Sequence, residues 1–386
     1  MNRFWTDVIE PLALELKPGI IVEIGSDEGA GTEKLLEFCR RTGARLHVID
    51  PKPAYDADAM QARWGEALVY HRALSLEVLP LLGAVDLALI DGDHNWYTVR
   101  HELELLHATA TRADAAFPLT FLHDVGWPYG RRDLYYDPAT VPAEGRQAYA
   151  NAGLAPGRSA LVPGGGYNAH CLNAVDENTP RNGVLTAIED FIADHPDEDF
   201  VLQILPALFG MAILYRRSDP RPPALESRLA DMALDPIARA VVALAEGERI
   251  DALIEAQALQ RRVDLLERRL EAAEGALESH QAALGQVSER LSRSRGEASR
   301  LQGVAAMKGA ELDIRNAELA ARSAELAHAR TDASALREGW AQWEASFTGR
   351  AVARLRRLSA RWPGLARAVQ RIVHMALKAR ARLAGQ

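Results

Sequence analysis

The chain has 386 residues, of which 48% are hydrophobic and 25% are charged, and its formal net charge is −8. This composition is that of a folded protein of two or a few domains, and it excludes a chain that is disordered throughout. Two cysteines, Cys39 and Cys171, are too few for a disulfide framework and indicate a reducing location. The longest apolar stretch, 202–215, has about 14 residues and contains Pro206, whereas a membrane span needs about 20.

Short apolar runs alternate with helix-like segments along the first 216 residues. The runs that predict strands are 20–24, 46–49, 67–70, 87–90 and 119–122, and the segments between them predict helices at 32–41, 57–64, 74–82 and 99–108. Two later strands, 200–205 and 211–215, follow a predicted helix at 183–194 and are typical of a closing hairpin. The alternation predicts an α/β fold with a Rossmann-like, doubly wound, mostly parallel sheet and a closing antiparallel hairpin.

Composition divides the chain into four parts. The α/β domain spans 1–217, and its residues 125–182, rich in Gly, Pro, Tyr and Asn, predict a lid or binding loop because they are long for a connection. A proline-rich break begins a linker and helical neck at 218–255. A coiled coil at 256–347 and a basic amphipathic tail at 348–386 follow.

The third part carries an unbroken seven-residue repeat. Every seventh residue from Leu270 to Ala333 is Leu or Ala, and the series ends in Trp340 and Phe347. Such a repeat is typical of a coiled coil, and about 90 helical residues predict a rod of about 135 Å. A solitary solvated helix is the alternative, but it would leave the apolar stripe in water. We expect a parallel homo-oligomer, either a dimer or a trimer.

The first predicted strand leads into a glycine turn. Glu23 precedes Gly25 and Gly29, and Asp50 ends the next strand about twenty residues later. Glycines let the backbone approach a ligand closely, and a carboxylate at that position suits the hydroxyls of a ribose. Because the turn lacks the Gly-x-Gly-x-x-Gly pattern that holds a pyrophosphate, it favours S-adenosylmethionine over NAD. A purely structural turn is the alternative.

Acidic residues and histidines follow the fourth and fifth predicted strands. Asp91 and His94 belong to the run Asp-Gly-Asp-His, and His123 and Asp124 follow the fifth strand. Ligands of open α/β sheets bind at the carboxyl ends of strands, so we expect these groups to converge with the glycine turn. Asp91, His123 and Asp124 offer two carboxylates and an imidazole to a divalent cation, and His94 suits a general base. Alternatively, the aspartates cap the following segments and the histidines are inert.

These motifs resemble those of class I S-adenosylmethionine-dependent methyltransferases. The most similar branch contains macrocin-type sugar O-methyltransferases and cephalosporin-hydroxylase-like proteins, and the resemblance covers about 18–125 and the hairpin to about 216. It implies that the cofactor is held by Glu23, Gly25, Ser26, Gly29, Asp50 and Asp91. It also implies Mg²⁺ at Asp91 and Asp124, and removal of a proton from the acceptor hydroxyl by His94. Some relatives have two acidic residues where this chain has His123-Asp124, which leaves a metal-independent variant open.

The predicted lid supplies candidate residues for the acceptor. We expect contacts with a polar, hydroxylated molecule from Tyr167, His170, Glu177 and Arg181. A face for stacking on a sugar ring is expected from Trp127, Tyr135 and Tyr136. The alternative for the end of this loop is that Asn178 or Thr179 caps the following helix.

The C-terminal tail reverses the charge of the rest of the chain. Residues 349–386 contain ten Lys and Arg and no Asp or Glu, whereas the first 348 residues contain 35 basic and 53 acidic side chains. Interleaved apolar residues make this the pattern of a helix that lies on anionic lipid. A partner protein is an alternative. We expect no nucleic-acid partner, because bulky apolar residues contribute little against a phosphate backbone.

The four parts together predict a cytoplasmic enzyme at the inner face of the membrane. We expect an S-adenosylmethionine-dependent O-methyltransferase that methylates a sugar hydroxyl of a surface polysaccharide or its precursor. The alternative is a catalytically silent coiled-coil scaffold of a membrane-associated glycan-assembly complex.

Overall fold

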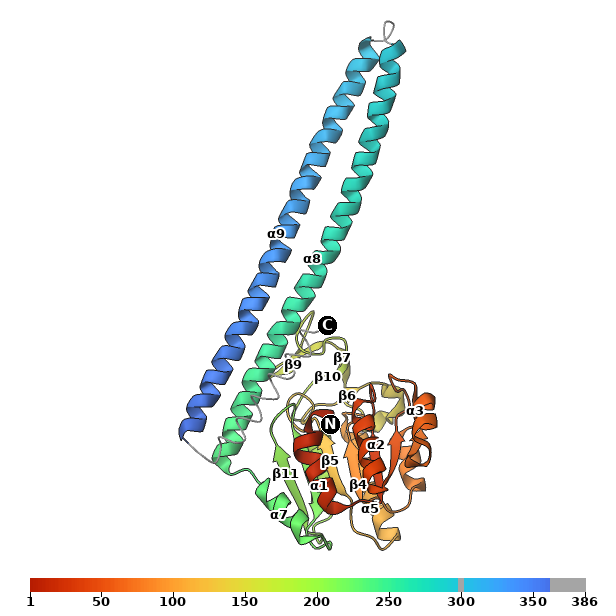
Figure 1. The fold of residues 1–386 in the computed structure, drawn as a ribbon, viewed down its shortest axis with the longest axis vertical. Helices are drawn as coiled ribbons and strands as arrows, with labels where there is room; N and C mark the ends of the chain where they lie inside the picture. The colour runs from red at the N-terminus through yellow and green to blue at the C-terminus, as the bar shows by residue number, and fades with distance from the viewer. Residues whose placement is uncertain (298–301, 362–386) are drawn as a thin grey trace. The chain divides into compact units, whose positions relative to one another are not determined.

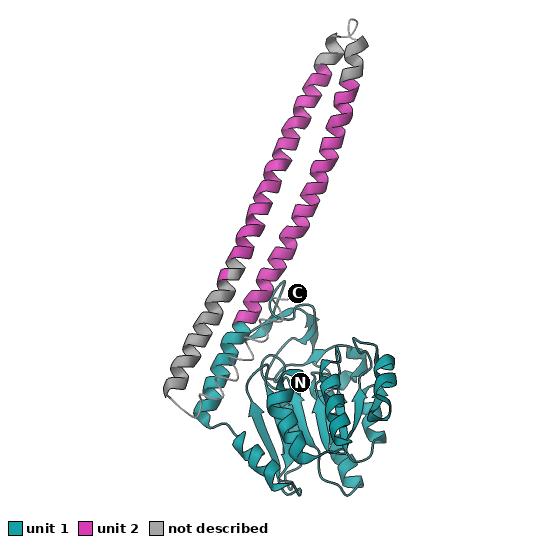
Figure 2. Ribbon diagram, viewed as in Figure 1, with its two compact units in different colours: residues 1–251 teal, residues 252–386 magenta. Residues whose placement is uncertain are grey.

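The structure is a computed structural model that describes residues 1–297 and 302–361. The chain divides into two compact units, residues 1–251 and residues 252–386 (Figure 2). No helix of the described residues combines the length and hydrophobicity that crossing a bilayer requires.

A seven-stranded sheet forms the centre of the first unit. Its strands, in spatial order, are β3 Leu68–His71, β2 Arg45–Ile49, β1 Ile20–Ile24, β4 Leu87–Ile90, β5 Leu119–His123, β12 Met211–Arg216 and β11 Phe200–Leu205. β1 to β5 are parallel, and β12 pairs antiparallel with both β5 and β11. The predicted mostly parallel sheet with its closing hairpin is confirmed. The strand order reverses between β1 and β4, which is where open sheets bind their ligands.

Helices cover both faces of the sheet (Figure 1). One face carries the 3₁₀ turn Asn2–Phe4, the π-helical turn Trp5–Ile9, α1 Glu10–Leu16, α2 Ala30–Thr42, α3 Ala57–Trp64 and α7 Pro223–Asp231. The other face carries α4 Ser75–Val78, α5 Trp96–Arg112 and α6 Val184–Asp194. Short 3₁₀ turns occur at Gly65–Ala67, Leu79–Leu81, Pro138–Thr140 and Ala143–Gly145. Because strand residues alternate in direction, Ile21 packs in the first core and Val22 in the second.

The first unit extends beyond the predicted boundary at residue 217. Leu225 and Leu229 of α7 are buried in the core, and the Gln203 side-chain amide donates a hydrogen bond to the Leu229 carbonyl oxygen at 3.0 Å. The unit ends at Asp251, inside α8, Pro236–Glu297. The segment predicted as a linker and helical neck, 218–255, thus contains α7 and the start of α8, and most of it belongs to the first unit.

Residues 125–182 contain two small sheets. One consists of β6 Leu134–Tyr135, β10 Leu172–Ala174 and β7 Tyr149–Asn151, and the other of β8 Gly153–Ala155 and β9 Arg158–Val162. Buried Asp133 anchors this segment, since its carboxylate accepts hydrogen bonds from the backbone N–H groups of Trp96 and Gly183. Gly183 is the N-cap of α6 and no side chain caps the helix, so the predicted capping by Asn178 or Thr179 is wrong.

The second unit is built from two long helices that run antiparallel. It contains the part of α8 from Ala252 onward and α9, Gln302–Arg361. Ion pairs join Glu267 to Arg337 and Glu274 to Arg330, and His280 Nε2 lies 3.4 Å from Glu318 Oε2. The partner numbers fall along α9 as they rise along α8, so the heptad repeat folds back on itself. The predicted single rod is wrong. A heptad repeat identifies an apolar stripe that packs against another helix, but it does not identify the segment that supplies this helix. Association between copies stays a prediction.

The predicted basic tail, 348–386, lies only partly within the described residues. α9 continues to Arg361, and residues 362–386 lie outside the described part. Binding of the tail to a membrane stays a prediction.

Candidate functional site

Asp50, at the end of β2, holds the glycine turn that follows β1. Its Oδ2 accepts hydrogen bonds from the Ser26 backbone N–H at 2.8 Å, the Ser26 hydroxyl at 2.9 Å and the Asp27 backbone N–H at 3.2 Å. Its Oδ1 accepts one from the Lys52 backbone N–H at 2.8 Å. The observed role of Asp50 is therefore to shape the turn, and its contact with a ribose stays a prediction.

The two glycines of the turn have positive φ angles, 83° at Gly25 and 80° at Gly29. A Cβ on Gly25 would lie 2.4 Å from the Asp91 carbonyl oxygen, because the ends of β1 and β4 meet there. A Cβ on Gly29 would lie 3.0 Å from the Tyr55 ring. Glycine at 25 thus lets the turn lie directly against the segment that carries Asp91.

Glu23 is buried beneath the turn. Its Oε2 accepts a hydrogen bond from the Thr32 hydroxyl at 2.6 Å, which joins β1 to the first turn of α2. Burial raises the pKa of Glu23 to about 8, against the opposing effect of the Thr32 hydrogen bond. Its carboxyl group is therefore mostly protonated at neutral pH. The observed role of Glu23 is structural, and its contact with a cofactor stays a prediction.

Buried polar atoms beside the turn lack partners within the described residues. The Tyr55 hydroxyl and the Asn2 side-chain oxygen make no hydrogen bond of acceptable geometry there. Tyr55 faces Gly29, and Asn2 lies close to Gly31 at the start of α2. Because buried polar groups are nearly always paired, these two atoms fit a polar ligand bound against the turn.

β4 and β5 bring four titratable side chains together. His94 Nε2 lies 2.9 Å from Asp124 Oδ2 and 3.6 Å from Asp91 Oδ1, and the shorter contact is an ion pair without hydrogen-bond alignment. His123 Nδ1 lies 3.1 Å from Asp91 Oδ1 and 3.3 Å from Asp124 Oδ2. The Met1 ammonium lies 2.5 Å from Asp91 Oδ2. The predicted convergence of these strand-end residues is confirmed, whereas their catalytic roles stay predictions.

The carboxylates and imidazoles of the cluster shift one another's pKa values. Burial disfavours the charged imidazoles, but the neighbouring carboxylates outweigh it and raise the pKa of His94 well above its ordinary value and that of His123 to about 9. Against the same effect of burial, the imidazoles hold the pKa values of Asp91 and Asp124 below their usual range. Two carboxylates therefore face two imidazolium groups at neutral pH.

The residues predicted to bind a divalent cation lie near enough to share one. The ligand atoms of Asp91, His123 and Asp124 are all within 4.8 Å of one another. The set fits Mg²⁺ poorly, because Mg²⁺ takes oxygen ligands and His123 offers nitrogen. The other ring nitrogen of His123 lies 3.0 Å from the Leu208 carbonyl oxygen, and both carboxylates are already paired. Binding of Mg²⁺ stays a prediction.

Two tyrosines of the segment after β5 flank His94. Tyr129 stacks on the imidazole at 5.7 Å and 7°, and the Tyr136 hydroxyl lies 3.4 Å from His94 Nδ1. Tyr136 is 63% exposed, whereas Tyr135 is buried and donates a hydrogen bond to Asp133. Tyr136, one of the aromatic residues predicted to stack on a sugar, therefore lies exposed beside His94, whereas Tyr135 does not. Tyr129 was not predicted, because its contact with His94 depends on the path of a turn that shows no periodic pattern.

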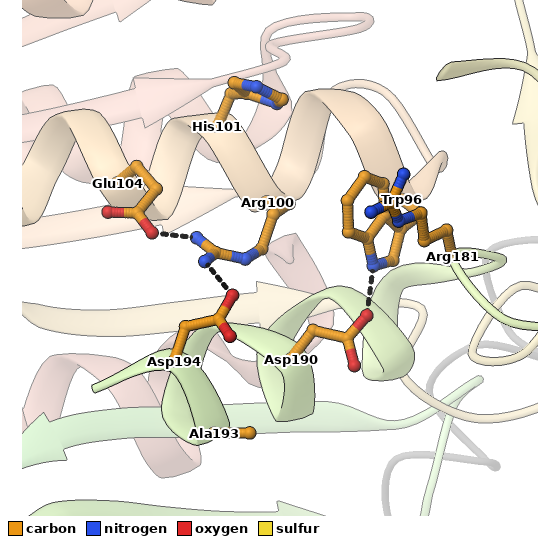
Figure 3. A pocket seen from close by; sticks show the side chains of 8 residues that line it. All are labelled: Trp96, Arg100, His101, Glu104, Arg181, Asp190, Ala193 and Asp194. Carbon is orange, nitrogen blue, oxygen red and sulfur yellow. Dashed lines mark hydrogen bonds and ion pairs between the residues drawn. The ribbon is translucent and has the colours of Figure 1, made fainter. Parts of the chain in front are cut away.

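The four predicted acceptor residues lie in different surroundings. Tyr167 packs against Trp127 and Phe209, Glu177 lies 3.4 Å from buried Arg132, and His170 is exposed. Arg181 lies 5.4 Å above the Trp96 ring, where both line a cavity of about 400 Å³ between α5 and α6 (Figure 3). The grouping predicted from the loop composition is therefore not observed, because composition does not determine the path of a loop.

Residues 22–115 match a family model described as a methyltransferase domain. The match extends from β1 past the end of α5. It therefore includes the glycine turn, Asp50, Asp91 and His94. A search of the curated proteins finds no match.

Several solved structures resemble the chain at low identity. One is the SAH-bound methyltransferase PaMTH1 of Podospora anserina, which is 17% identical in sequence. The alignment covers 54% of this chain and 77% of that chain, and the TM-score is 0.34. The 1,6-didemethyltoxoflavin-N1-methyltransferase of Burkholderia thailandensis is 17% identical. Its alignment covers 56% of this chain and 81% of that chain, with a TM-score of 0.31. A putative caffeoyl-CoA O-methyltransferase of Staphylococcus aureus is 14% identical. Its alignment covers 54% of this chain and 80% of that chain, with a TM-score of 0.32. Similarity at this level says nothing about the substrate of this chain.

Proposed function

We propose that the first unit is an S-adenosylmethionine-dependent O-methyltransferase that acts on a sugar hydroxyl of a surface polysaccharide or its precursor. The observation that carries this proposal is the meeting of the glycine turn with Asp91, His94 and Asp124 at one edge of the sheet. The methyltransferase-domain match over residues 22–115 supports the reaction class. The sugar acceptor is supported by the resemblance of the Asp-Gly-Asp-His motif and by exposed Tyr136 beside His94.

Methyl transfer to a hydroxyl needs alignment and removal of one proton. The bond between the acceptor oxygen and the methyl carbon forms as the bond between sulfur and carbon breaks, and the hydroxyl proton passes to a base. When bound, the cofactor supplies the methyl group on a sulfonium, which is a good leaving group. Neutral His94 accepts the proton, Asp124 orients its ring, and Asp91 lies between the glycine turn and His94. The carboxylates raise the pKa of His94, and a positive charge bound near Asp91 would oppose them and favour the neutral form.

The proposal is tested by transfer of labelled methyl groups. The full chain is assayed against a panel of nucleotide sugars and lipid-linked glycans, with and without Mg²⁺. We expect His94→Ala to lower transfer by about 10²–10⁴-fold, while calorimetry shows unchanged binding of S-adenosylhomocysteine. His101→Ala is the matched control, because His101 lies on α5 and its Nδ1 contacts the Tyr97 carbonyl oxygen at 2.7 Å. Undiminished turnover in His94→Ala would refute the role of His94 as base.

A catalytically silent scaffold is the second candidate. It is favoured by the observation that Glu23 and Asp50 make structural hydrogen bonds and that the charges of the Asp91 cluster are already paired. Calorimetry separates the two candidates. Binding of S-adenosylhomocysteine supports the enzyme, whereas absence of both binding and transfer supports the scaffold.

A further inference from the structure

A second cluster of metal-ligand side chains lies outside the site described above. Glu104 and His107 belong to α5, and His195 follows α6. The ligand atoms of these three residues lie within 4.8 Å of one another. The His107 ring lies 6.4 Å from that of Phe117, which precedes β5, whereas His123 ends β5. The two clusters therefore lie at opposite ends of this strand.

One distance in the second cluster is close to that between the ligands of a tetrahedral ion. His195 Nε2 lies 3.6 Å from Glu104 Oε2, and His107 Nε2 lies 2.6 Å from Oε1 of Glu198, which precedes β11. In a tetrahedral site with bonds of about 2.0–2.1 Å, neighbouring ligand atoms are about 3.4 Å apart. The separation between Glu104 and His195 is close to this value, whereas His107 and Glu198 are closer together and have to move apart to share a metal.

Hydrogen bonds already orient the ligand atoms. His195 Nδ1 lies 2.8 Å from the Phe191 carbonyl oxygen, which accepts the ring N–H there and leaves the Nε2 lone pair facing Glu104. Arg100 pairs with Glu104 Oε1, and Arg216 lies 3.0 Å from Glu198 Oε2. In each glutamate the other oxygen faces a histidine. Metal sites use this arrangement, in which neighbouring groups fix ligands, as they do here for His195, Glu104 and Glu198.

The surroundings exclude much of the water but leave a path to the cluster. The His107 and His195 side chains are 15% and 19% exposed, and the rings of Phe191 and Phe200 lie 6.0 Å and 6.1 Å from that of His107. Figure 3 shows Glu104 at the wall of the cavity between α5 and α6, with Arg100 between it and Asp194. An ion can therefore reach Glu104 from this cavity.

We propose that Glu104, His107 and His195, with Glu198 as the fourth ligand, form a structural site for Zn²⁺. Two imidazoles and two carboxylates suit a borderline metal better than Mg²⁺ or Ca²⁺. Four protein ligands are typical of structural zinc sites, which leave no position open for a substrate. Bound Zn²⁺ joins α5 to the end of α6 and the start of β11. The proposal does not depend on the methyltransferase reaction.

The test is a Co²⁺ titration of the chelator-treated full chain, followed by displacement with Zn²⁺. We expect one equivalent of Co²⁺ to give the visible absorption of a tetrahedral site and Zn²⁺ to abolish it. Zn²⁺ should also raise the melting temperature. His107→Ala and His195→Ala should each weaken binding by on the order of 10–100-fold or more. Two matched variants should leave it unchanged: His101→Ala on the same helix, and Asp91→Asn with Asp124→Asn in the other cluster.

Several results would overturn the proposal. These are absence of stoichiometric binding in the wild-type chain, tight binding that survives His107→Ala with His195→Ala, and loss of binding in the Asp91→Asn and Asp124→Asn chain alone. Far-UV circular dichroism shows whether the histidine variants fold. If they do not, Glu104→Gln replaces them in the test, because glutamine keeps the size of the side chain. A folded Glu104→Gln chain with unchanged affinity would equally contradict the assignment.

Discussion

At the level of single residues, Asp124 sets the charge of His94. The two side chains lie 2.9 Å apart, and the carboxylate raises the pKa of the imidazole against the effect of burial. A base works only in its neutral form, so we expect kcat/KM for methyl transfer to rise with pH above neutrality. Asp124→Asn removes the negative charge and lowers the pKa of His94, so this rise should move to lower pH. A pH profile of kcat/KM for both chains measures the shift, and an unchanged midpoint would count against His94 as the base.

Glu102 makes the stability of the first unit depend on pH. It is fully buried on α5, its Oε1 accepts a hydrogen bond from the Ser75 hydroxyl at 2.5 Å, and its Oε2 has no hydrogen-bond partner among the described residues. Burial raises its pKa from 4.5 to about 8, against the opposing effect of Ser75. The folded chain therefore holds a proton that the unfolded chain releases in this range. The contribution of Glu102 to stability is complete below pH 4.5 and is lost as pH rises towards 8.

We expect Glu102→Gln to flatten this dependence, because glutamine keeps the size of the side chain and does not titrate. The loss due to Glu102 is at most about 1.4 kcal/mol per pH unit. Urea unfolding of both chains at several pH values between 5 and 8 measures it. Exposed Glu77 on α4 provides the control, since Glu77→Gln should leave the slope unchanged. Equal slopes in the wild type and Glu102→Gln would show that Glu102 does not titrate as proposed.

At the level of elements, the ion pairs between α8 and α9 lie within one chain. Glu274 and Arg330 are 2.5 Å apart in the hairpin, whereas a parallel rod places Glu274 beside the same residue of another copy. We therefore expect Glu274→Cys with Arg330→Cys, joined by a short thiol cross-linker, to migrate as a monomer on a denaturing gel. Glu274→Cys alone is the control, and Cys171 is replaced by Ser in both chains because it is not fully buried. A dimeric band from the double variant would favour the parallel rod.

The hairpin leaves part of its apolar surface uncovered. Leu326 and Ala333 are buried, whereas Leu265 is 53% exposed and Ile314 is 61% exposed. In a two-helix hairpin each helix buries only one side of the apolar stripe of the other. The remaining apolar surface can be buried only by a further helix or another protein surface. A homo-oligomer would provide such cover, and association between copies stays a prediction.

At the level of the whole molecule, charge separates the tail from the rest of the chain. The ten basic residues of 349–386 follow a segment in which acidic residues outnumber basic ones by 53 to 35. We predict that the full chain sediments with anionic vesicles and that a chain ending at Phe347 does not, because the tail supplies the attraction to anionic lipid. Salt should weaken the binding, and zwitterionic vesicles should not sediment the protein. Equal sedimentation of both chains with anionic vesicles would exclude the tail as the membrane-binding segment.

The sequence by itself determined the features that depend on neighbours along the chain. The bounds of β1, β4 and β11 agree with the prediction to the residue, because apolar runs of this length are bounded by local turn signals. The meeting of Asp91, His94, His123 and Asp124 was also predictable, since parallel strands end at one edge of a sheet.

Only the tertiary structure decided what covers each apolar surface and which partner each polar group finds. α7 joins the core, the heptad repeat folds into a hairpin, Asp50 holds the glycine turn, and Glu23 joins β1 to α2. The cluster of Glu104, His107 and His195 likewise forms only when α6 packs on α5. Periodicity identifies a surface that needs a partner, but the partner is distant in sequence. Its identity therefore depends on how the whole chain packs.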